Sequence, residues 1–405
     1  MMNPAADRAH ASVTKTRPGV LVLVSTLSFG GAEKHAVSLV NSLDASQFRL
    51  LLCHIKSADT LLRELDRSQA EAVFTLAAAK GIDPSAVRSL AERIDSNDID
   101  VIVGTNGFSV IYALAAMAFC SKRPKVIGVF HTTLVGGFKS RLRMLLHKRA
   151  FKRCDLLVYV SEAQRRWWEA RGLRARRETV IQNGINVERF TSRSSIEDRR
   201  ALRATLGFGA QDYVVGICAA LRREKAHIDL LQAISRLRTM DASVKLMIIG
   251  DGQERSSIEK NIQALGLENC AVITGYRQDV RPFIEACDVM VLCSHAVETF
   301  SIAALEAMAL GKPLVLTRIG GAEEQVIPGK NGFLYEPGDI DALTGHLREL
   351  ADPERRNQMG ARGAQLVRER FTVEKMAQAF AQEIAGLTTP SVSTARSMPM
   401  PRLAK

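Results

Sequence analysis

Two glutamates separated by seven residues occupy the stretch of the sequence with the most chemical character. Glu298 follows an apolar segment, and Glu306 lies among small apolar residues that continue to Leu310. A carboxylate in such surroundings needs a counter-ion or a ligand hydroxyl to offset its removal from water. A salt-bridged helix residue is the plainer interpretation of Glu306 taken alone, whereas the pair together favours a ligand site.

The residues between the two glutamates predict the start of a helix over 300–310. Thr299 can cap this helix. The first open backbone amides would then belong to Phe300, Ser301 and Ile302. The segment offers a carboxylate before the helix, amides for a phosphate at its tip and a second carboxylate about two turns along. A nucleotide sugar presents sugar hydroxyls, a diphosphate and ribose hydroxyls, which match these groups in turn.

A glycine pair, Gly30-Gly31, follows one predicted strand and opens a predicted helix. Adjacent glycines let the backbone approach a ligand closely, and the free amides of the helix favour anionic oxygens. An ordinary turn between a strand and a helix is the alternative interpretation.

Two further loops carry candidate side chains. Arg222, Arg223 and Lys225 lie between a strand and a helix, where an open parallel sheet binds its ligands, although a solvated run of charges is the alternative. His131 directly follows another predicted strand. It either faces a cleft or is a structural histidine, and the sequence favours neither interpretation. Gly250-Asp251-Gly252 lacks the third glycine of a dinucleotide fingerprint and is weak evidence for NAD.

The elements that must position these residues alternate between short apolar strands and amphipathic helices. This alternation predicts an α/β protein with parallel strands covered on both faces. A chain of 405 residues is long enough for two such domains. The predicted organisation is a disordered tail, an N-terminal α/β domain, a C-terminal α/β domain, a final helix and a second disordered tail. The corresponding ranges are 1–17, 18–186, 187–371, 372–388 and 389–405.

Basic residues are concentrated in residues 139–177, which hold thirteen Lys and Arg against three acids and contain Trp167 and Trp168. A helix over 137–153 would turn four apolar residues inward: Leu142, Leu145, Leu146 and Ala150. The basic residues around them suit an anionic membrane surface, and a solvated basic face is the alternative. The chain has no RNP-like aromatic pattern or helix-turn-helix pattern, so nucleic acid is not an expected partner.

Seven scattered cysteines without a CxxC pair indicate reduced thiols. The N-terminus lacks the apolar core of a secretory signal, and no apolar run approaches the roughly 18 residues that span a bilayer. We therefore expect a cytoplasmic protein that is peripheral on the inner face of the plasma membrane if the basic stretch binds lipid.

Over residues 20–387, the sequence resembles the family 4 retaining glycosyltransferases, also called group 1, which have the GT-B fold of two Rossmann-like domains facing across a cleft. The resemblance rests on several short motifs in a fixed order. These are Gly30 to Glu33, Ile181 to Asn186, Glu224-Lys225, Gly250 to Gly252, Gly275 to Arg277 and Glu298 to Pro313.

This resemblance implies that the N-terminal domain, 18–186, binds the acceptor and that the C-terminal domain, 187–371, binds the nucleotide-sugar donor. The helix over 372–388 would cross back to the first domain, and the donor site would be formed from both domains. Gly30 and Gly31 would approach the diphosphate and Lys225 would neutralise it. Glu298 would contact the donor sugar beside Phe300, Ser301 and Ile302, and Glu306 would hold the ribose. Backbone at Tyr276 and Arg277 would flank the base, and His131 would lie near the reacting sugar, so His131, Lys225 and Glu298 are the predicted catalytic residues. Ala220 stands where the family commonly has arginine, which leaves Arg222 or Arg223 to supply that charge.

The predicted function is a metal-independent hexosyltransferase that uses a UDP- or GDP-linked sugar as co-substrate and no cofactor. We see no DxD-type carboxylate pair and no obvious covalent nucleophile. The acceptor would be a saccharide or a lipid-linked sugar of bacterial cell-surface polysaccharide or glycolipid synthesis. A catalytically inactive GT-B partner subunit and an NAD-dependent Rossmann oxidoreductase are the alternatives.

Overall fold

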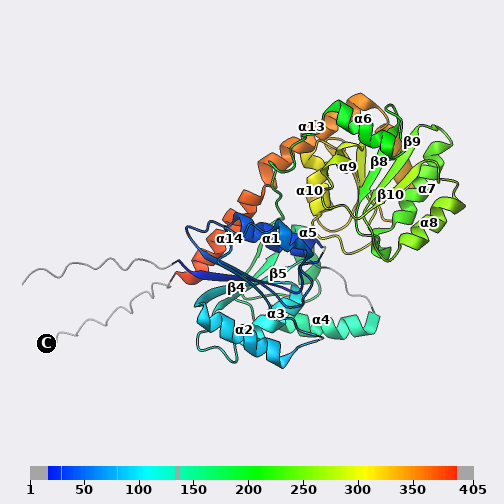
Figure 1. The fold of residues 1–405 in the computed structure, drawn as a ribbon. Helices are drawn as coiled ribbons and strands as arrows, with labels where there is room; N and C mark the ends of the chain where they lie inside the picture. Colours follow the sequence, from blue (N-terminus) through cyan, green and yellow to red (C-terminus); the bar gives the residue numbers. More distant parts are fainter. Residues whose placement is uncertain (1–16, 29, 80, 133–136, 390–405) are drawn as a thin grey trace, which may run out of the picture.

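The computed structural model describes residues 17–389 except 29, 80 and 133–136, and describes no side chain in 137–143. The two predicted tails lie almost wholly outside these residues. Within the described residues, the chain forms two α/β domains, each built on its own parallel sheet (Figure 1).

The sheet of the first domain has, in the described part of the chain, seven parallel strands in the order β3-β2-β1-β4-β5-β6-β7. Alternate residues of its central strand belong to different cores, with Val20 and Val22 on one face and Leu21 and Leu23 on the other. Apolar residues on both faces are what a doubly covered parallel strand requires. The strands are β1 (Gly19–Val24), β2 (Arg49–His54), β3 (Ala72–Thr75), β4 (Ile99–Thr105), β5 (Lys125–Phe130), β6 (Leu156–Tyr159) and β7 (Glu178–Val180).

Helices cover both faces of this sheet. Figure 1 shows α1 and α14 on one face and α2, α3 and α4 on the other. The helical elements here are α1 (Gly31–Ser42), η1 (Thr60–Glu64), α2 (Pro84–Ser96), α3 (Asn106–Ala116), α4 (Gly137–Phe151), α5 (Glu162–Glu169) and α14 (Val373–Thr388).

The second domain repeats this architecture. In the described residues its sheet has six parallel strands in the order β10-β9-β8-β11-β12-β13. The strands are β8 (Tyr213–Cys218), β9 (Val244–Ile249), β10 (Ala271–Gly275), β11 (Val289–Leu292), β12 (Leu314–Thr317) and β13 (Gly332–Tyr335). The helical elements are α6 (Ile196–Thr205), η2 (Arg223–Lys225), α7 (His227–Arg238), α8 (Arg255–Ala264), α9 (Arg281–Glu285), α10 (Ile302–Ala309), α11 (Ala322–Gln325), α12 (Ile340–Glu349) and α13 (Pro353–Arg370). The predicted fold class, two Rossmann-like parallel-sheet domains, is confirmed.

The chain passes between the domains twice, and the two passages lie side by side. The Ile185 amide donates to the Phe371 carbonyl at 3.0 Å, and the Val373 amide donates to the Ile185 carbonyl at 2.9 Å. A Cβ on Gly184 would lie 2.2 Å from the Thr372 carbonyl oxygen, so only glycine fits this crossing. From there α14 packs against α1 and β4 of the first domain. These paired passages are where the two domains can hinge.

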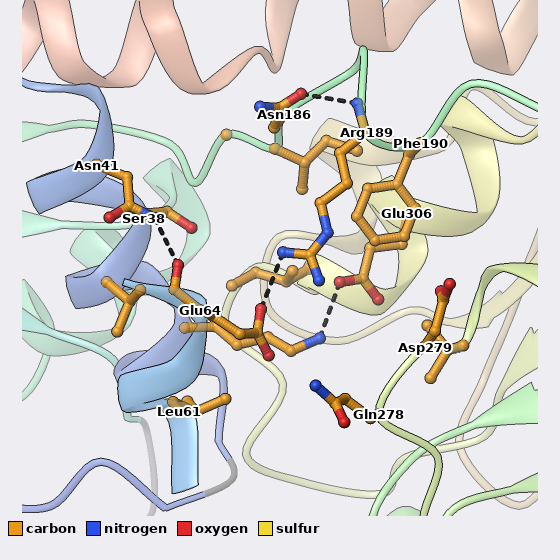
Figure 2. Close-up of a pocket in the computed structure, with 16 residues that line it drawn as sticks. Ser38, Asn41, Leu61, Glu64, Asn186, Arg189, Phe190, Gln278, Asp279 and Glu306 are labelled. Atoms are coloured by element: carbon orange, nitrogen blue, oxygen red, sulfur yellow. Dashed lines mark hydrogen bonds and ion pairs between the residues drawn. The ribbon is translucent and has the colours of Figure 1, made fainter. Parts of the chain in front are cut away.

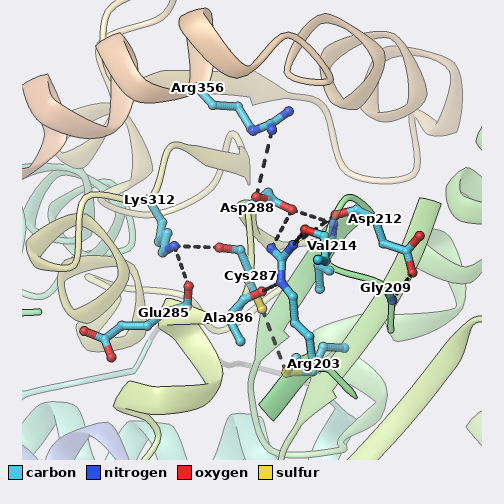
Figure 3. A network of polar contacts seen from close by, with 12 residues as sticks. Arg203, Gly209, Asp212, Val214, Glu285, Ala286, Cys287, Asp288, Lys312 and Arg356 are labelled. Carbon is cyan, nitrogen blue, oxygen red and sulfur yellow. Dashed lines mark hydrogen bonds and ion pairs between the residues drawn. The ribbon is translucent and has the colours of Figure 1, made fainter. Parts of the chain in front are cut away.

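A buried charge network fastens the start of the second domain to its sheet (Figure 3). Arg203 of α6 donates to Asp288 at 2.9 Å, to the Ala286 carbonyl at 2.9 Å and to the Asp212 carbonyl at 3.1 Å. Asp288 also accepts from the Val214 amide at 2.8 Å. The Arg203 side chain is only 12 % exposed. A second guanidinium, Arg356, lies 3.9 Å from the other oxygen of Asp288, so Arg203 supplies the shorter of two ion pairs in the network.

Replacing Arg203 by methionine should destabilise the second domain by about 2–4 kcal/mol, because Asp288 keeps only the longer contact with Arg356 and the carbonyls of Ala286 and Asp212 lose their donor. Urea denaturation followed by circular dichroism measures this change. Arg200→Met is the matched control, since Arg200 lies exposed on the same helix and should change the stability by less than about 0.5 kcal/mol. Equal effects of the two substitutions would contradict the assignment.

Candidate active site

The loops that carry the predicted residues leave the carboxyl ends of strands near the point where each strand order reverses. In the first sheet this point lies between β1 and β4, and in the second between β8 and β11. Open parallel sheets bind ligands at such points. A Cβ on Gly31, in the loop after β1, would lie 4.0 Å from Cδ1 of Ile302 at the start of α10. The glycine turn of the first domain therefore faces the start of α10 in the second.

Lys225 and Glu298 form a close ion pair within the second domain. Lys225 Nζ lies 2.6 Å from Glu298 Oε2, and the Ser294 hydroxyl donates to the same oxygen at 3.2 Å. Val297, just before the glutamate, has φ of 66°. This left-handed conformation strains a β-branched residue, and such strain concentrates at functional sites. The structure brings together two of the three predicted catalytic residues.

The predicted start of the helix is wrong by two residues. The N-cap of α10 is Ser301, whose hydroxyl accepts from the Ala304 amide at 3.2 Å. The Thr299 hydroxyl instead donates to the His131 carbonyl of the first domain at 3.4 Å. The Ser301 amide is occupied by the Gln325 side chain at 3.2 Å. Gln325 comes from a distant segment that the local pattern could not reveal, so the open amides of the first turn begin at Ile302.

Glu306 pairs with a lysine from the other domain (Figure 2). Lys34 Nζ of α1 lies 2.9 Å from Glu306 Oε1, and the glutamate is only 4 % exposed. The charge of Glu306 raises the pKa of the Lys34 ammonium. Glu306 is therefore salt-bridged, as one interpretation expected. It also lines the cleft between the domains, where the other interpretation places a ligand site.

A cavity of about 70 Å³ surrounds this ion pair. Its walls come from both domains and from the passage between them: Lys34, Val37, Ser38, Asn41, Leu61, Glu64, Gly184, Ile185, Asn186, Arg189, Phe190, Gln278, Asp279, Val280, Ile302 and Glu306. Ligand pockets usually measure roughly 300–1,000 Å³. A nucleoside therefore enters only if side chains in this cavity move.

The glutamate beside the glycine pair folds back over the first turn of α1. A Cβ on Gly30 would lie 2.2 Å from Glu33 Oε2. Burial raises the pKa of the Glu33 carboxyl, and its own backbone amide and the charge of Arg222 oppose that rise. The choice between Arg222 and Arg223 as the second cation stays a prediction.

His131 lies against a second histidine that sequence reasoning missed. The rings of His131 and His35 meet edge to face with centroids 4.7 Å apart. Burial lowers the pKa of His35 to about 4, and burial followed by the neighbouring His35 lowers the pKa of His131. The His131 amide donates to the Asn106 side chain at 3.0 Å, and Asn106 has a left-handed φ of 66°. Both rings are therefore neutral near pH 7, and the backbone of His131 is anchored.

Asn183 joins this histidine pair to the second domain. Its side-chain oxygen lies 3.1 Å from His35 Nδ1, and its side-chain amide donates to the Phe300 carbonyl at 2.9 Å. The link runs from α1 through the interdomain passage to the loop before α10. Asn183 lies within a motif that carried the family resemblance, but its partners come from distant segments.

Tyr276 and Arg277 lie at the exposed outer end of the cleft, in the loop after β10. Tyr276 is 44 % exposed, and Arg277 stacks over the Phe283 ring at 4.8 Å. The next residue, Gln278, accepts from Arg63 of the first domain at 3.2 Å. This loop therefore closes one side of the cavity around Glu306.

The basic stretch shows a different face from the predicted one. Leu145 and Leu146 of α4, expected to point inward, are 54 % and 55 % exposed, and Met144 and Phe151 are buried instead. The prediction was wrong for these two leucines because the helix turns a different stripe toward α3, whereas Ala150 is buried as predicted. Leu142 and the side chains of Lys139 to Arg143 lie outside the described residues. Exposed basic residues follow the two leucines along the chain: Arg149, Lys152, Arg153, Arg166, Arg171, Arg174, Arg176 and Arg177.

No group of three or more metal-ligating side chains was found among the described residues, and none of the helices described there has the length and apolar character needed to cross a bilayer. The predicted metal independence stays a prediction.

Two family matches divide the chain near the interdomain passage. Residues 29–189 match Glycosyltransferase Family 4, and residues 198–366 match Glycosyl transferases group 1. A GDP-mannose-dependent monoacylated alpha-(1-6)-phosphatidylinositol monomannoside mannosyltransferase of Corynebacterium glutamicum is 30 % identical over 73 % of this chain and 78 % of its own length. The chain belongs to the group 1, family 4 glycosyltransferases.

Other relatives agree with this assignment. An N-acetyl-alpha-D-glucosaminyl L-malate synthase of Bacillus anthracis is 31 % identical over 44 % of this chain and 47 % of its own length. The alignment thus spans about half of that relative. The crystal structure of Anabaena HepE with UDP-glucose superposes with a TM-score of 0.79 at 24 % identity, covering 91 % of this chain and 99 % of that one. The GT-B fold of this glycosyltransferase follows from that likeness.

The buried histidines predict how this glycosyltransferase responds to acid. Between pH 6.5 and about 4 the unfolded chain binds a proton at His35 that the folded chain does not, so stability falls as the pH falls. The loss is on the order of 2 kcal/mol between pH 7 and pH 5. Urea unfolding at the two pH values should show a smaller loss for His35→Gln than for the wild type. His295→Gln, at an exposed position, should keep the wild-type loss, and equal losses in all three proteins would refute the prediction.

Proposed function

We propose that this glycosyltransferase moves a hexose from a nucleotide-diphosphate sugar to a saccharide or lipid-linked acceptor and retains the anomeric configuration. The observation that carries the proposal is the meeting of Gly31 and Ile302 across the cleft, with Lys225–Glu298 and Glu306 on the second domain. The names of the relatives support a nucleotide-sugar donor, since one is GDP-mannose-dependent and one neighbour was solved with UDP-glucose. A role in bacterial cell-surface polysaccharide or glycolipid synthesis fits the same relatives.

The diphosphate is the group that the cleft would stabilise most. Negative charge grows on it as the sugar–phosphate bond breaks, and Lys225, Arg222 and the open amides from Ile302 onward would offset that charge. Lys225 would exchange its present partner, Glu298, for the phosphate. Glu298 would then be free to accept from a hydroxyl of the donor sugar.

Closure of the two domains would exclude water from the reacting sugar. The described residues at the cleft include no side chain placed as an obvious covalent nucleophile. Same-face attack would therefore form the new bond between the acceptor oxygen and the anomeric carbon as the bond to the phosphate breaks. The acceptor proton would pass to a phosphate oxygen of the leaving group. Neutral His131 would hydrogen-bond the sugar near the reacting carbon rather than supply a charge.

A catalytically inactive partner subunit is the second candidate, and the internal pairing of Lys225, Glu298 and Glu306 without ligand makes it worth testing. Turnover separates the two, since an inactive subunit would bind a sugar nucleotide without releasing nucleoside diphosphate in the presence of acceptor. The oxidoreductase alternative has no support in the family assignment.

A panel of UDP-, GDP- and ADP-sugars should contain one member that raises the thermal midpoint of the wild-type protein, because a ligand that binds the folded state stabilises it. Lys225→Met should weaken the binding of that sugar nucleotide by about 2–4 kcal/mol, since a cation–diphosphate contact is lost in a low-dielectric cleft. Lys260→Met, at an exposed position on α8, is the control and should bind normally. No shift with any nucleotide would refute the proposed function.

The exposed face of α4 suits an anionic lipid surface, which would bring a lipid-linked acceptor to the cleft. Leu145 and Leu146 can enter the interface while the surrounding bases meet the headgroups. The three acids of the stretch do not cancel these charges, because Asp155 pairs with Lys125 and the other two pair with Arg165. The protein would then act at the cytoplasmic face of the membrane.

Flotation with vesicles that contain phosphatidylglycerol should carry the wild-type protein upward at low salt, and added salt should release it. Replacing both Leu145 and Leu146 by serine should lower the bound fraction several-fold, since two apolar side chains leave the interface. Met240→Ser removes an equally exposed apolar residue from the second domain and should float like the wild type. Identical flotation of all three proteins, or none at low salt, would contradict this surface.

A further inference from the structure

The Lys34 ammonium pairs with the carboxylate of Glu306, which is the group that the ribose of a donor would bind. Lys34 comes from the first domain and reaches Glu306 of the second at 2.9 Å. The flanking Gly31 already lies against Ile302 on the same helix as the glutamate. The ion pair therefore spans the cleft at the position proposed for the nucleoside.

Glu306 cannot stand alone at this position. It is only 4 % exposed and lies on a helix whose other residues are apolar, so water cannot solvate it. A buried carboxylate without a partner is strongly unfavourable. Lys34 satisfies it in the unliganded protein, and a ribose diol could replace the ammonium by donating two hydrogen bonds to the same carboxylate.

The space at this position does not hold both partners. Lys34 and Glu306 both line the cavity of about 70 Å³, which is smaller than a nucleoside. A second interdomain pair, Arg189 with Glu64 at 3.0 Å, lies beside the first in the same cavity (Figure 2). Entry of a ribose at Glu306 thus requires Lys34 to move.

Lys34 also lies in the first turn of α1, close to the amides that the diphosphate would approach. Glu33, its neighbour, now covers Gly30 with a carboxylate. An anion at this helix end is stabilised by the open amides and the helix dipole. If the Lys34 ammonium left Glu306, it would therefore lie close to a diphosphate bound at the first turn of α1.

We propose that Lys34 is an interdomain contact that the donor exchanges, called the Lys34 strap below. Lys34 binds Glu306 before the donor enters the cleft. When the ribose of the donor hydrogen-bonds to Glu306, Lys34 transfers to the diphosphate. The proposal rests on the proposed role of Glu306 as the ribose ligand. Lys34 is then a specificity residue, because it opposes ligands that carry a ribose without phosphates and assists ligands that carry both.

The test compares how a substitution at Lys34 changes the affinity for a nucleoside and for the diphosphate of the same nucleoside. The proposal predicts changes of opposite sign. Calorimetry with uridine and UDP, or guanosine and GDP if the panel selects that base, compares the wild type with Lys34→Met. We expect the nucleoside to bind the variant about threefold or more tightly, since the competing ammonium is gone. We expect the nucleoside diphosphate to bind about tenfold more weakly, since one charge contact is lost.

Lys125→Met is the matched control, because Lys125 forms a surface ion pair with Asp155 at 3.0 Å and should change neither affinity by more than about twofold. If Lys34→Met does not fold, Lys34→Gln keeps a donor for Glu306 and should show the same opposite changes at reduced size.

The outcomes separate the two proposals. Weaker binding of both ligands, or no change in either, would overturn the strap and leave the donor site intact. Failure of the wild type to bind any nucleoside diphosphate would overturn the proposed function and the strap together.

Discussion

The buried carboxylate of Glu306 is the constraint on which the arrangement of the two domains depends. It lies on α10 among apolar neighbours and is 4 % exposed, so it requires a cation or hydrogen-bond donors at all times. The second domain does not supply the cation, which comes from α1 of the first. The Lys34–Glu306 pair therefore neutralises this charge and joins the two domains at once, alongside the contacts of Thr299 with His131 and of Asn183 with Phe300.

Topology explains why the other charged groups gather at the same place. Each sheet reverses its strand order once, and the loops after β1, β8 and β11 leave from these reversals. When the two reversals face each other, a glycine turn, a cationic loop and a helix tip must converge. Lys225 and Glu298 neutralise each other at 2.6 Å, and under the proposed function a ligand with both a phosphate and hydroxyls would separate them.

The sequence revealed the long, uniformly apolar strands and the loops between them, since these depend on local patterns. It missed β3, β7 and β13, which are only three or four residues long and, in the first two cases, only partly buried. It placed the helix cap at Thr299 because Gln325, which occupies the Ser301 amide, is invisible to a local pattern. The helical spacing of Leu145 and Leu146 fits an inward stripe as well as an outward one. Only the packing of α4 against α3 shows that both leucines are exposed. Lys34 was beside a recognised glycine pair, but only its partner from the other domain gives it a role.

The link from His131 to α10 shows how closure can reach the reacting sugar without moving charge. His131 contacts His35, Asn183 binds His35 at 3.1 Å, and the same amide holds the Phe300 carbonyl at 2.9 Å. Burial keeps both imidazoles neutral, so no proton has to move when the domains shift. The link can only transmit position. Under the proposed function, the seating of the loop before α10 against the first domain would set where the His131 ring meets the sugar, and the Lys34–Glu306 pair joins the same two domains.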